Sequence, residues 1–545
     1  MLSFIVLFIF TFLIVFVQFK IWKITPNVIF PVCTFVFYYW SLAGAWIFTI
    51  DQSFGEFGRY LNMTYYVYLE KVYPVKLDST YAQMIVYYGL FILFFQLTIY
   101  LILKRRFKNQ VSKKSLKLIF LDTRIISVMI FIFIILSFVI VKIPIYKSIM
   151  LEESVYANVR KGLVPFYSFH QLFNLSACFL SYFTLAVYLK NDEDSQFKIV
   201  KSKSGLVCFT LLFIATNVWL VFLGNKHEIL ILGITSFLFL AYPVLNYKHL
   251  KSLILLTVIL FVSFVLTDPI RSLAPVLLKP FKQSSFITNS DMQIRIANYV
   301  KIEENKSFND LKLIEKEKIR MLKRKHKKFR ANLIDEKKDH KSLYEIKEEI
   351  SNNLHIKNSS HVYYGKSKFD QIKIALATIA FSNEMFSGQF SLYASLKEKL
   401  PISIGHSFYS AFCVFIPRSI IKDRPVSSYE YYSKKLELDP AQGFTINHAT
   451  DWYLNFGFIG VLMGGVFWGA LISFLYLGSV IVVSDVLKNL SFISLISVAA
   501  YFSMIIRGGI DILKVIVFES ILIPIMLLLV CHFLYSYLIL FKKNK

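Results

Sequence analysis

The sequence predicts an all-α, polytopic membrane protein with about eleven transmembrane helices, and three observations predict this fold class. Hydrophobic residues make up 56% of the 545 residues and charged residues only 18%, whereas soluble domains are about 45–50% apolar even with Gly counted. The apolar residues gather in runs long enough to cross a bilayer. Basic residues gather between those runs and give a net charge of +26. This balance excludes an ordinary soluble enzyme, a disordered chain and a small secreted disulfide domain.

The apolar runs predict the individual spans. A helix needs about 20 mainly apolar residues to cross the hydrocarbon core of a bilayer, and runs such as 81–103 and 452–484 carry no charge at all. Lipid offers an open backbone no hydrogen-bond partner, so these runs are expected to be helices. The first run lacks a basic leader and a cleavage site, and we interpret it as a retained helix. The expected spans are 3–22, 27–50, 81–103, 124–142, 165–189, 204–224, 228–246, 252–268, 453–482, 489–506 and 514–540.

The short loops predict the orientation. The loop 104–117 contains seven basic residues and no acidic one, which is typical of a cytoplasmic loop. Alternation then places the N-terminus outside and the C-terminus inside. The chain divides into eight helices (1–268), a long extracytoplasmic loop (269–452), and three helices with a basic cytoplasmic tail (453–545).

The long loop contains three segments of different character. Residues 301–360 form a highly charged insertion of helix-favouring composition. We expect a solvated helical hairpin; the alternative is a surface for anionic lipid or acidic polysaccharide, and the extracytoplasmic position argues against nucleic acid. Residues 369–385 have the spacing of an interfacial helix. Residues 404–421 are apolar but too short and broken to span, so a re-entrant or interfacial segment is expected.

The motifs of soluble enzymes are absent. The sequence has no P-loop, no GxGxxG, no HExxH and no GxSxG, and its five cysteines have no CxxC spacing. We therefore expect neither a metal nor a cofactor.

Cationic side chains return repeatedly to the predicted outer boundary of the membrane. Each alone could be a headgroup anchor, but together they would suit a lipid-linked pyrophosphate, because Arg binds phosphate through paired hydrogen bonds and fixed cations can neutralise a leaving group without a metal. Arg418 and Arg424 are the candidates for the reacting centre. The candidates for holding pyrophosphate are Arg160, Lys226, Arg271, Arg295 and Arg507.

Transfer of a group from such a pyrophosphate to an acceptor also needs a base that takes a proton from the acceptor hydroxyl. His448 and Asp451 are three residues apart and share one face of a helix, so either could be the base while the other orients it. Glu519 is a further candidate, because an acid inside a span is costly.

Two segments carry a family resemblance. IPRSIIKDRPVSSYEYY (416–432) and TDWYLNFGFIGVLMGGVFWG (450–469) resemble the C-terminal signature of bacterial oligosaccharide repeat-unit polymerases of the Wzy type. In that resemblance Arg418 matches the Arg of an "iPR" element and Asp451 matches the acid before "NFG". The chain departs from the pattern at Arg424, where Lys is usual, at Asp451, where Glu is more frequent, and at Lys226, where relatives often carry Arg. The insertion 301–360 has no counterpart.

The resemblance implies a GT-C-like membrane glycosyltransferase. It would move a growing glycan from undecaprenyl pyrophosphate onto the next lipid-linked repeat unit, making O-antigen, capsular or exopolysaccharide. Its partners would be the lipid-linked donor and acceptor, membrane lipid and a chain-length regulator.

Two alternatives stay open. An O-antigen ligase shares the chemistry but uses another acceptor. A lipid-linked oligosaccharide transporter would predict internal repeats and polar residues at mid-membrane, whereas the sequence shows no repeat. Glycines at 457, 460, 464, 465 and 469 form a small-residue face, which we interpret as a helix-packing surface, the alternative being space for a prenyl tail.

Overall fold

The computed structural model describes most of the spans and three short helices of the long loop. The described residues are 2–54, 72, 74, 77–107, 119–151, 167–190, 197–224, 226–244, 247–277, 388–413, 416, 421, 425–438, 445–482, 484–513 and 515–543. The expected insertion 301–360 and the expected interfacial helix 369–385 lie outside them.

Helices dominate this part of the chain. The elements are α1 (Leu2–Ile24), α2 (Ile29–Phe54), α4 (Ser79–Phe107), β1 (Ile119–Asp122), α5 (Thr123–Leu151), α7 (Tyr167–Lys190), β2 (Phe197–Val200), α8 (Lys203–Leu223), α9 (Lys226–Ala241), η1 (Tyr247–His249), α10 (Leu250–Leu277), α18 (Ser391–Lys397), α19 (His406–Cys413), α20 (Ser428–Lys435), α21 (His448–Ile481), α22 (Asp485–Gly508), η4 (Ile510–Ile512), the π-helix η5 (Val515–Leu522) and α23 (Ile523–Lys543).

The structure confirms an all-α polytopic membrane protein. Within the described ranges, nine helices are long and apolar enough to cross a membrane. The expected spans 228–246 and 252–268 correspond to α9 and α10, whose apolar stretches within the described ranges, Glu228–Ala241 and Leu250–Ser263, are shorter. The total of eleven therefore stays a prediction.

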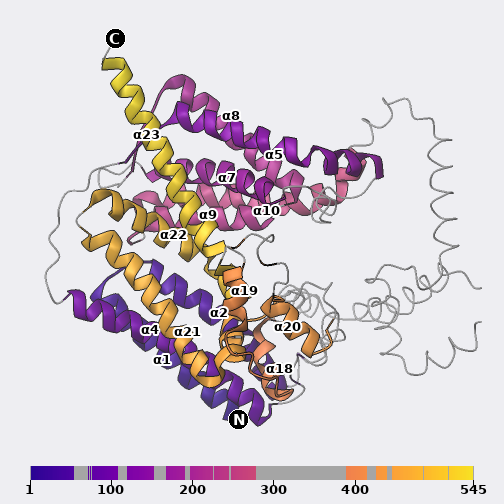
Figure 1. Cartoon of the computed structure of the whole chain (residues 1–545). Helices are drawn as coiled ribbons and strands as arrows, with labels where there is room; N and C mark the ends of the chain where they lie inside the picture. Colours follow the sequence, from indigo (N-terminus) through magenta and orange to yellow (C-terminus); the bar gives the residue numbers. More distant parts are fainter. Residues whose placement is uncertain are drawn as a thin grey trace, which may run out of the picture.

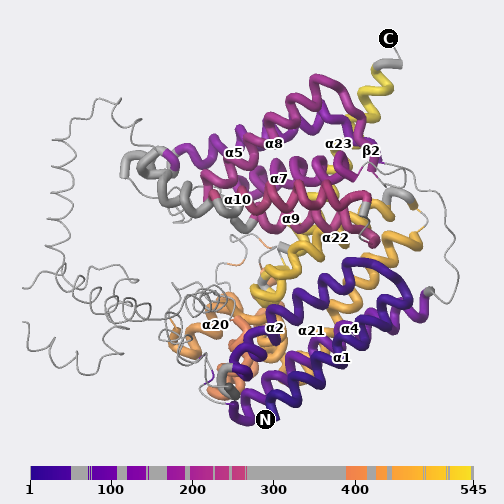
Figure 2. Tube along the Cα trace, turned by 180° about the vertical axis from the view of Figure 1, so that it is seen from behind, coloured from indigo at the N-terminus to yellow at the C-terminus, as the bar shows by residue number. Residues whose placement is uncertain are grey.

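The helices form two groups (Figure 1). One contains α5, α7, α8, α9 and α10, and the other contains α1, α2, α4 and α21. Helix α22 lies between them and contacts α2, α9 and α21. The view from behind shows the same division (Figure 2). The N-terminus and the C-terminus lie at opposite ends of the bundle, and the short helices α18, α19 and α20 cluster near the N-terminal end.

Large apolar side chains cover much of the outside. Phe12, Phe131 and Phe261 are each more than half exposed, and an exposed apolar patch of that extent on a polar-rimmed fold marks contact with protein or membrane. Their positions on α1, α5 and α10 agree with a lipid-facing belt.

A two-stranded sheet departs from the all-helical expectation. β1 and β2 pair in parallel, with Ile119 opposite Phe197 and Asp122 opposite Val200. The strands run directly into α5 and α8, where Asp122 accepts a hydrogen bond from the backbone N–H of Arg124 at 2.8 Å and Ser202 caps α8. Each strand has only four residues, too few to disturb the hydropathy pattern, and the sequence therefore did not predict β1 and β2.

Glycines bring α21 close to α4. A Cβ on Gly465 or Gly469 would lie 2.4 Å from the carbonyl oxygens of Phe91 and Phe95, respectively. The interpretation of the small-residue face as a packing surface is confirmed at these two positions, because no larger side chain fits against the backbone of α4.

Candidate functional site

The first turn of α21 is tied to α2. Asn447 caps the helix by accepting a hydrogen bond from the backbone N–H of Ala449 at 2.9 Å. Its amide donates to the carbonyl oxygen of Trp40 at 2.9 Å and to Ser41 at 3.1 Å. This capping fixes α21 five residues before the expected span began, so that the polar residues which follow lie inside the fold.

The "NFG" element (455–457) breaks α21 after about two turns. Gly457 has φ +62° and ψ −148°, a conformation that is essentially restricted to glycine. The break releases the carbonyl oxygen of Leu454, which accepts hydrogen bonds from the backbone N–H of Ser403 at 2.7 Å and from its hydroxyl at 3.1 Å. The "NFG" sequence thus provides a docking point for the loop that precedes α19.

Asp451 is the centre of the site. Its Oδ1 accepts hydrogen bonds from the hydroxyl of Ser407 at 2.5 Å and from the amide of Asn455 at 3.0 Å. Its Oδ2 accepts from the hydroxyl of Ser428 at 3.1 Å and from the backbone N–H of Ile510 at 2.6 Å. These donors come from α19, α21, α20 and η4, so one carboxylate joins four elements. We call these five residues the Asp451 cluster.

The cluster is buried and well supplied with donors. Asp451 is 1% exposed, and four donors match the roughly four lone-pair positions that a carboxylate offers. Hydrogen bonds to a charged acceptor are about twice as strong as neutral ones. With all four positions occupied, the carboxylate of Asp451 is arranged to position its neighbours. To act as a base, Asp451 would first have to release a donor.

The two loop helices are also joined to each other. The ring Nε2 of His406 lies 2.9 Å from the carbonyl oxygen of Val426, and the hydroxyl of Tyr431 donates to the carbonyl oxygen of Pro401 at 3.1 Å. Burial raises the pKa of Tyr432 well above its usual value, so α20 turns a neutral phenol to the interior.

His448 belongs to a neighbouring aromatic pocket. Its Nε2 accepts hydrogen bonds from the indole N–H groups of Trp452 at 3.0 Å and Trp468 at 2.7 Å. An indole N–H can only donate, so the neutral ring carries its proton on Nδ1. Among the described residues Nδ1 has no hydrogen-bond partner that meets normal geometry, and the ring is 2% exposed. His448 could accept a substrate proton at Nε2 only by losing both indole bonds.

Arg507 approaches the same region from the end of α22. Its guanidinium lies 5.9 Å from the centre of the Trp40 ring, a distance typical of a cation–π contact. Two glycines then lead to Ile510, whose N–H binds Asp451. Gly509 has φ +67°, and a Cβ there would lie 2.7 Å from Oδ2 of Asp451. The turn therefore requires glycine both for its backbone conformation and for its closeness to the carboxylate.

The structure places three of the nine predicted site residues in one region. Asp451 and His448 lie in the first turn of α21, and Arg507, at the end of α22, lies over Trp40, whose carbonyl oxygen accepts a hydrogen bond from the cap residue Asn447. Lys226 is the first residue of α9, and Arg271 lies in α10. Both helices belong to the group that contains α5, α7 and α8, and neither supplies one of the four donors described above for Asp451. The remaining four lie outside the described residues: Arg160, Arg295, Arg418 and Arg424.

Glu519, the further candidate base, lies elsewhere. It is half-buried in η5, and it is within electrostatic reach of the buried Tyr501 together with Glu228 of α9. This acidic region lies where η5, α22 and α9 adjoin. π-Helical turns are frequent at functional sites.

The sequence did not predict several residues of the site. Ser407 lies in the segment 404–421 and Ser428 in the segment 416–432, but an isolated serine gives no signal of its partner. Trp452 and Trp468 follow His448 by 4 and 20 residues. The i+4 spacing places Trp452 on the same helix face, which was a usable signal. Within the described ranges no group of three His, Cys, Asp or Glu could hold a metal ion.

Comparisons of the chain with protein families, with curated proteins and with solved structures find no match.

Proposed function

We propose that the protein is a membrane glycosyltransferase that polymerises undecaprenyl-pyrophosphate-linked repeat units into O-antigen, capsular or exopolysaccharide. It would act in the bacterial cytoplasmic membrane, with the N-terminus outside and the C-terminus inside. One observation supports this proposal most: the two segments that resemble the polymerase signature are joined by a hydrogen bond at Asp451. Ser428 of the first segment donates a hydrogen bond to Asp451 of the second.

The two arginines predicted for the reacting centre lie in the sequence between the two serines that bind Asp451. Arg424 precedes Ser428 by four residues, and Arg418 lies between Ser407 and Ser428 in the sequence. Because both serines bind Asp451, the segment that carries the two arginines begins and ends at the cluster. Arg507 supplies a third cation from α22. In a low-dielectric setting, fixed guanidinium groups stabilise the charge that develops on a pyrophosphate leaving group.

The acid–base role is assigned on the same geometry. Asp451 is the better of the two candidates, because opening the 3.1 Å bond from Ser428 would expose Oδ2 to an acceptor hydroxyl. His448 would have to give up two indole donors. In the proposed mechanism Asp451 therefore orients the arginine segment and accepts the proton, and His448 holds the first turns of α21 in place.

The glycan profile of a deletion strain tests the proposal. Deletion should abolish long glycans and leave single repeat units on the lipid carrier, and the wild-type gene should restore chain length. Arg418→Ala and Arg424→Ala should reach the membrane but fail to restore long chains. Lys435→Ala, which removes an exposed cation from α20, is the matched control and should restore them.

Other results would identify another function. Long chains that stay on the lipid carrier would indicate a ligase, and repeat units that stay on the cytoplasmic face would indicate a transporter. A normal glycan profile in the deletion strain would contradict all three.

A further inference from the structure

The loop that ends in α19 turns an apolar face outward. Ile402, Ile404, Tyr409 and Phe412 are between 50% and 81% exposed, and we call them the α19 apolar surface. The opposite face of the helix carries Ser407 and Ser410, which are buried. A helix on a water-exposed surface has the reverse arrangement, with its polar side chains outside.

The backbone at Ile404 strengthens this observation. Ile404 has φ +35° and is 81% exposed. A β-branched residue at positive φ is a genuine outlier, because its side chain crowds the backbone. In water an exposed isoleucine would gain nothing that offsets this strain. Contact with hydrocarbon supplies the missing gain, because it removes the apolar side chain from water.

The α19 apolar surface continues onto the lipid-facing side of α21. Ile402 Cδ1 lies 3.2 Å from the position that a Cβ on Gly457 would occupy. The next two residues of α21, Phe458 and Ile459, are 42% and 64% exposed. On the inner side, the ring of Phe408 contacts that of Trp452 at 5.0 Å. The loop therefore sits against the outward face of a membrane-spanning helix.

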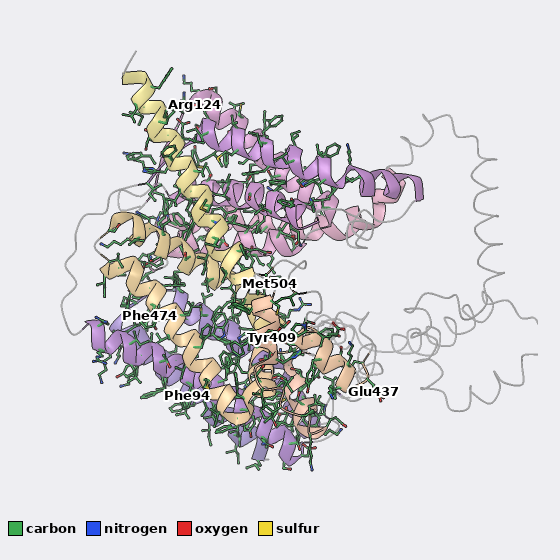
Figure 3. The ribbon with its side chains drawn as sticks, in the orientation of Figure 1. Phe94, Arg124, Tyr409, Glu437, Phe474 and Met504 are labelled. Carbon is green, nitrogen blue, oxygen red and sulfur yellow. The ribbon has the colours of Figure 1, made fainter. Side chains whose placement is uncertain are left out.

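Charge is absent from the whole segment. Residues 400–413 contain no Asp, Glu, Lys or Arg, so placing them in hydrocarbon carries no cost of burying a charge. The charged side chains that flank the segment in the described part of the loop are exposed: Lys397, Glu398 and Lys399 lie directly before it, and Lys434 and Lys435 lie on α20. Figure 3 shows Tyr409 on α19, with Glu437 beyond the end of α20.

We propose that the α19 apolar surface inserts into the acyl chains of the bilayer leaflet at this end of the bundle. Ser407, on the other face of α19, binds Asp451, so lipid on one side and the carboxylate on the other hold the helix. The insertion fixes the depth of the Asp451 cluster relative to the membrane surface. It depends on the membrane fold alone and not on the proposed glycosyl transfer.

Spin labelling of the full-length protein tests this insertion. Cys208, an exposed thiol of α8, is first replaced by Ser so that it takes no label. Ile404→Cys and Phe412→Cys are then labelled with a nitroxide and reconstituted in vesicles of phosphatidylethanolamine and phosphatidylglycerol. Phe474→Cys, on the exposed face of α21, serves as the lipid control, and Lys435→Cys serves as the water control.

The expected result is faster collision with oxygen than with a water-soluble nickel chelate at positions 404 and 412, as at 474, and the reverse at 435. Nickel access at either test position would overturn the proposal, because the surface would then face water. Low access to both reagents would also overturn it, because the surface would then pack against protein. Ile404→Trp provides a second reading, since brominated lipid should quench the fluorescence that this variant gains over the parent protein with its six tryptophans.

Discussion

The hydroxyl of Ser407 donates a hydrogen bond of 2.5 Å to Oδ1 of Asp451, although 44 residues separate the two in the chain. Ser428 reaches the other carboxylate oxygen from α20. One buried carboxylate therefore holds both short helices, one before and one after residues 414–424. A change at either serine should loosen the attachment of its own short helix without removing the carboxylate itself.

The double variant Ser407→Ala, Ser428→Ala separates the positioning role of Asp451 from its role as a base. Both hydroxyl donors disappear while the carboxylate stays, so we expect shorter glycan chains together with a lower melting temperature in detergent. Each lost hydrogen bond to the charged carboxylate should cost about 1.5–3 kcal/mol. Ser433→Ala is the control, because Ser433 lies on the same helix as Ser428 and its hydroxyl donates to the carbonyl oxygen of Glu430 within α20. Unchanged chain length in the double variant would contradict the positioning role, and only the role as a base would remain for Asp451.

Asp451→Asn should be more damaging than the serine variants. An amide replaces one acceptor oxygen with a donor, so two of the four donors lose their acceptor. A buried polar group without a partner costs about 1–3 kcal/mol. Thermal unfolding in detergent, followed by circular dichroism, measures the change against Glu430→Gln, an exposed carboxylate on α20. Equal melting temperatures in the two variants would show that the hydrogen bonds at Asp451 contribute little.

The pocket around His448 gives an asymmetric prediction. His448→Phe removes the ring nitrogen that accepts from the indole N–H groups of Trp452 and Trp468, and each buried donor left without a partner should cost about 1–3 kcal/mol. Trp468→Phe removes one donor and should cost only about 0.5–1.5 kcal/mol plus some packing. Melting temperatures should therefore fall further in His448→Phe. The opposite order would indicate that ring packing, and not the acceptor, dominates this pocket.

The hydropathy of the sequence was sufficient for the fold class, because the composition of each span is set by its contact with lipid over about 20 residues. The hydropathy alone did not establish a full span at α9, whose apolar stretch ends at Ala241. It also did not predict β1 and β2, which pair with each other although 78 residues separate them in the chain. Asp451, His448 and Arg507 were predicted from residue type. Their partners were not, since Ser407, Ser428 and the N–H of Ile510 reach Asp451 only through the tertiary fold.

The contact between α21 and α4 should not tolerate even a methyl group. In Gly465→Ala and Gly469→Ala the new Cβ would lie 2.4 Å from a backbone oxygen of α4, so the helices would have to separate. Overpacking of this kind costs about 1–3 kcal/mol. Gly478→Ala is the matched control on the same helix, because its new Cβ would meet the side chain of Ser491, which can move. A smaller loss at 465 and 469 than at 478 would mean that the two helices are less closely packed than described.

Gly509→Ala should affect both the fold and the site. Alanine at φ +67° strains the backbone by about 1–3 kcal/mol. Its methyl group would also lie 2.7 Å from Oδ2 of Asp451, where it would displace the N–H of Ile510. We therefore expect a lower melting temperature and a loss of long glycans.

Gly405→Ala isolates the backbone contribution, since Gly405 has φ +76° but a Cβ there would meet nothing within 4 Å. If backbone strain alone matters, Gly509→Ala and Gly405→Ala should lose similar amounts of stability and should shorten the glycan chains equally. If the carboxylate matters, Gly509→Ala should lose long glycans at a temperature where both proteins remain folded. The second result is the one we expect, because a shift of Asp451 is transmitted through Ser407 and Ser428 to both ends of the arginine segment.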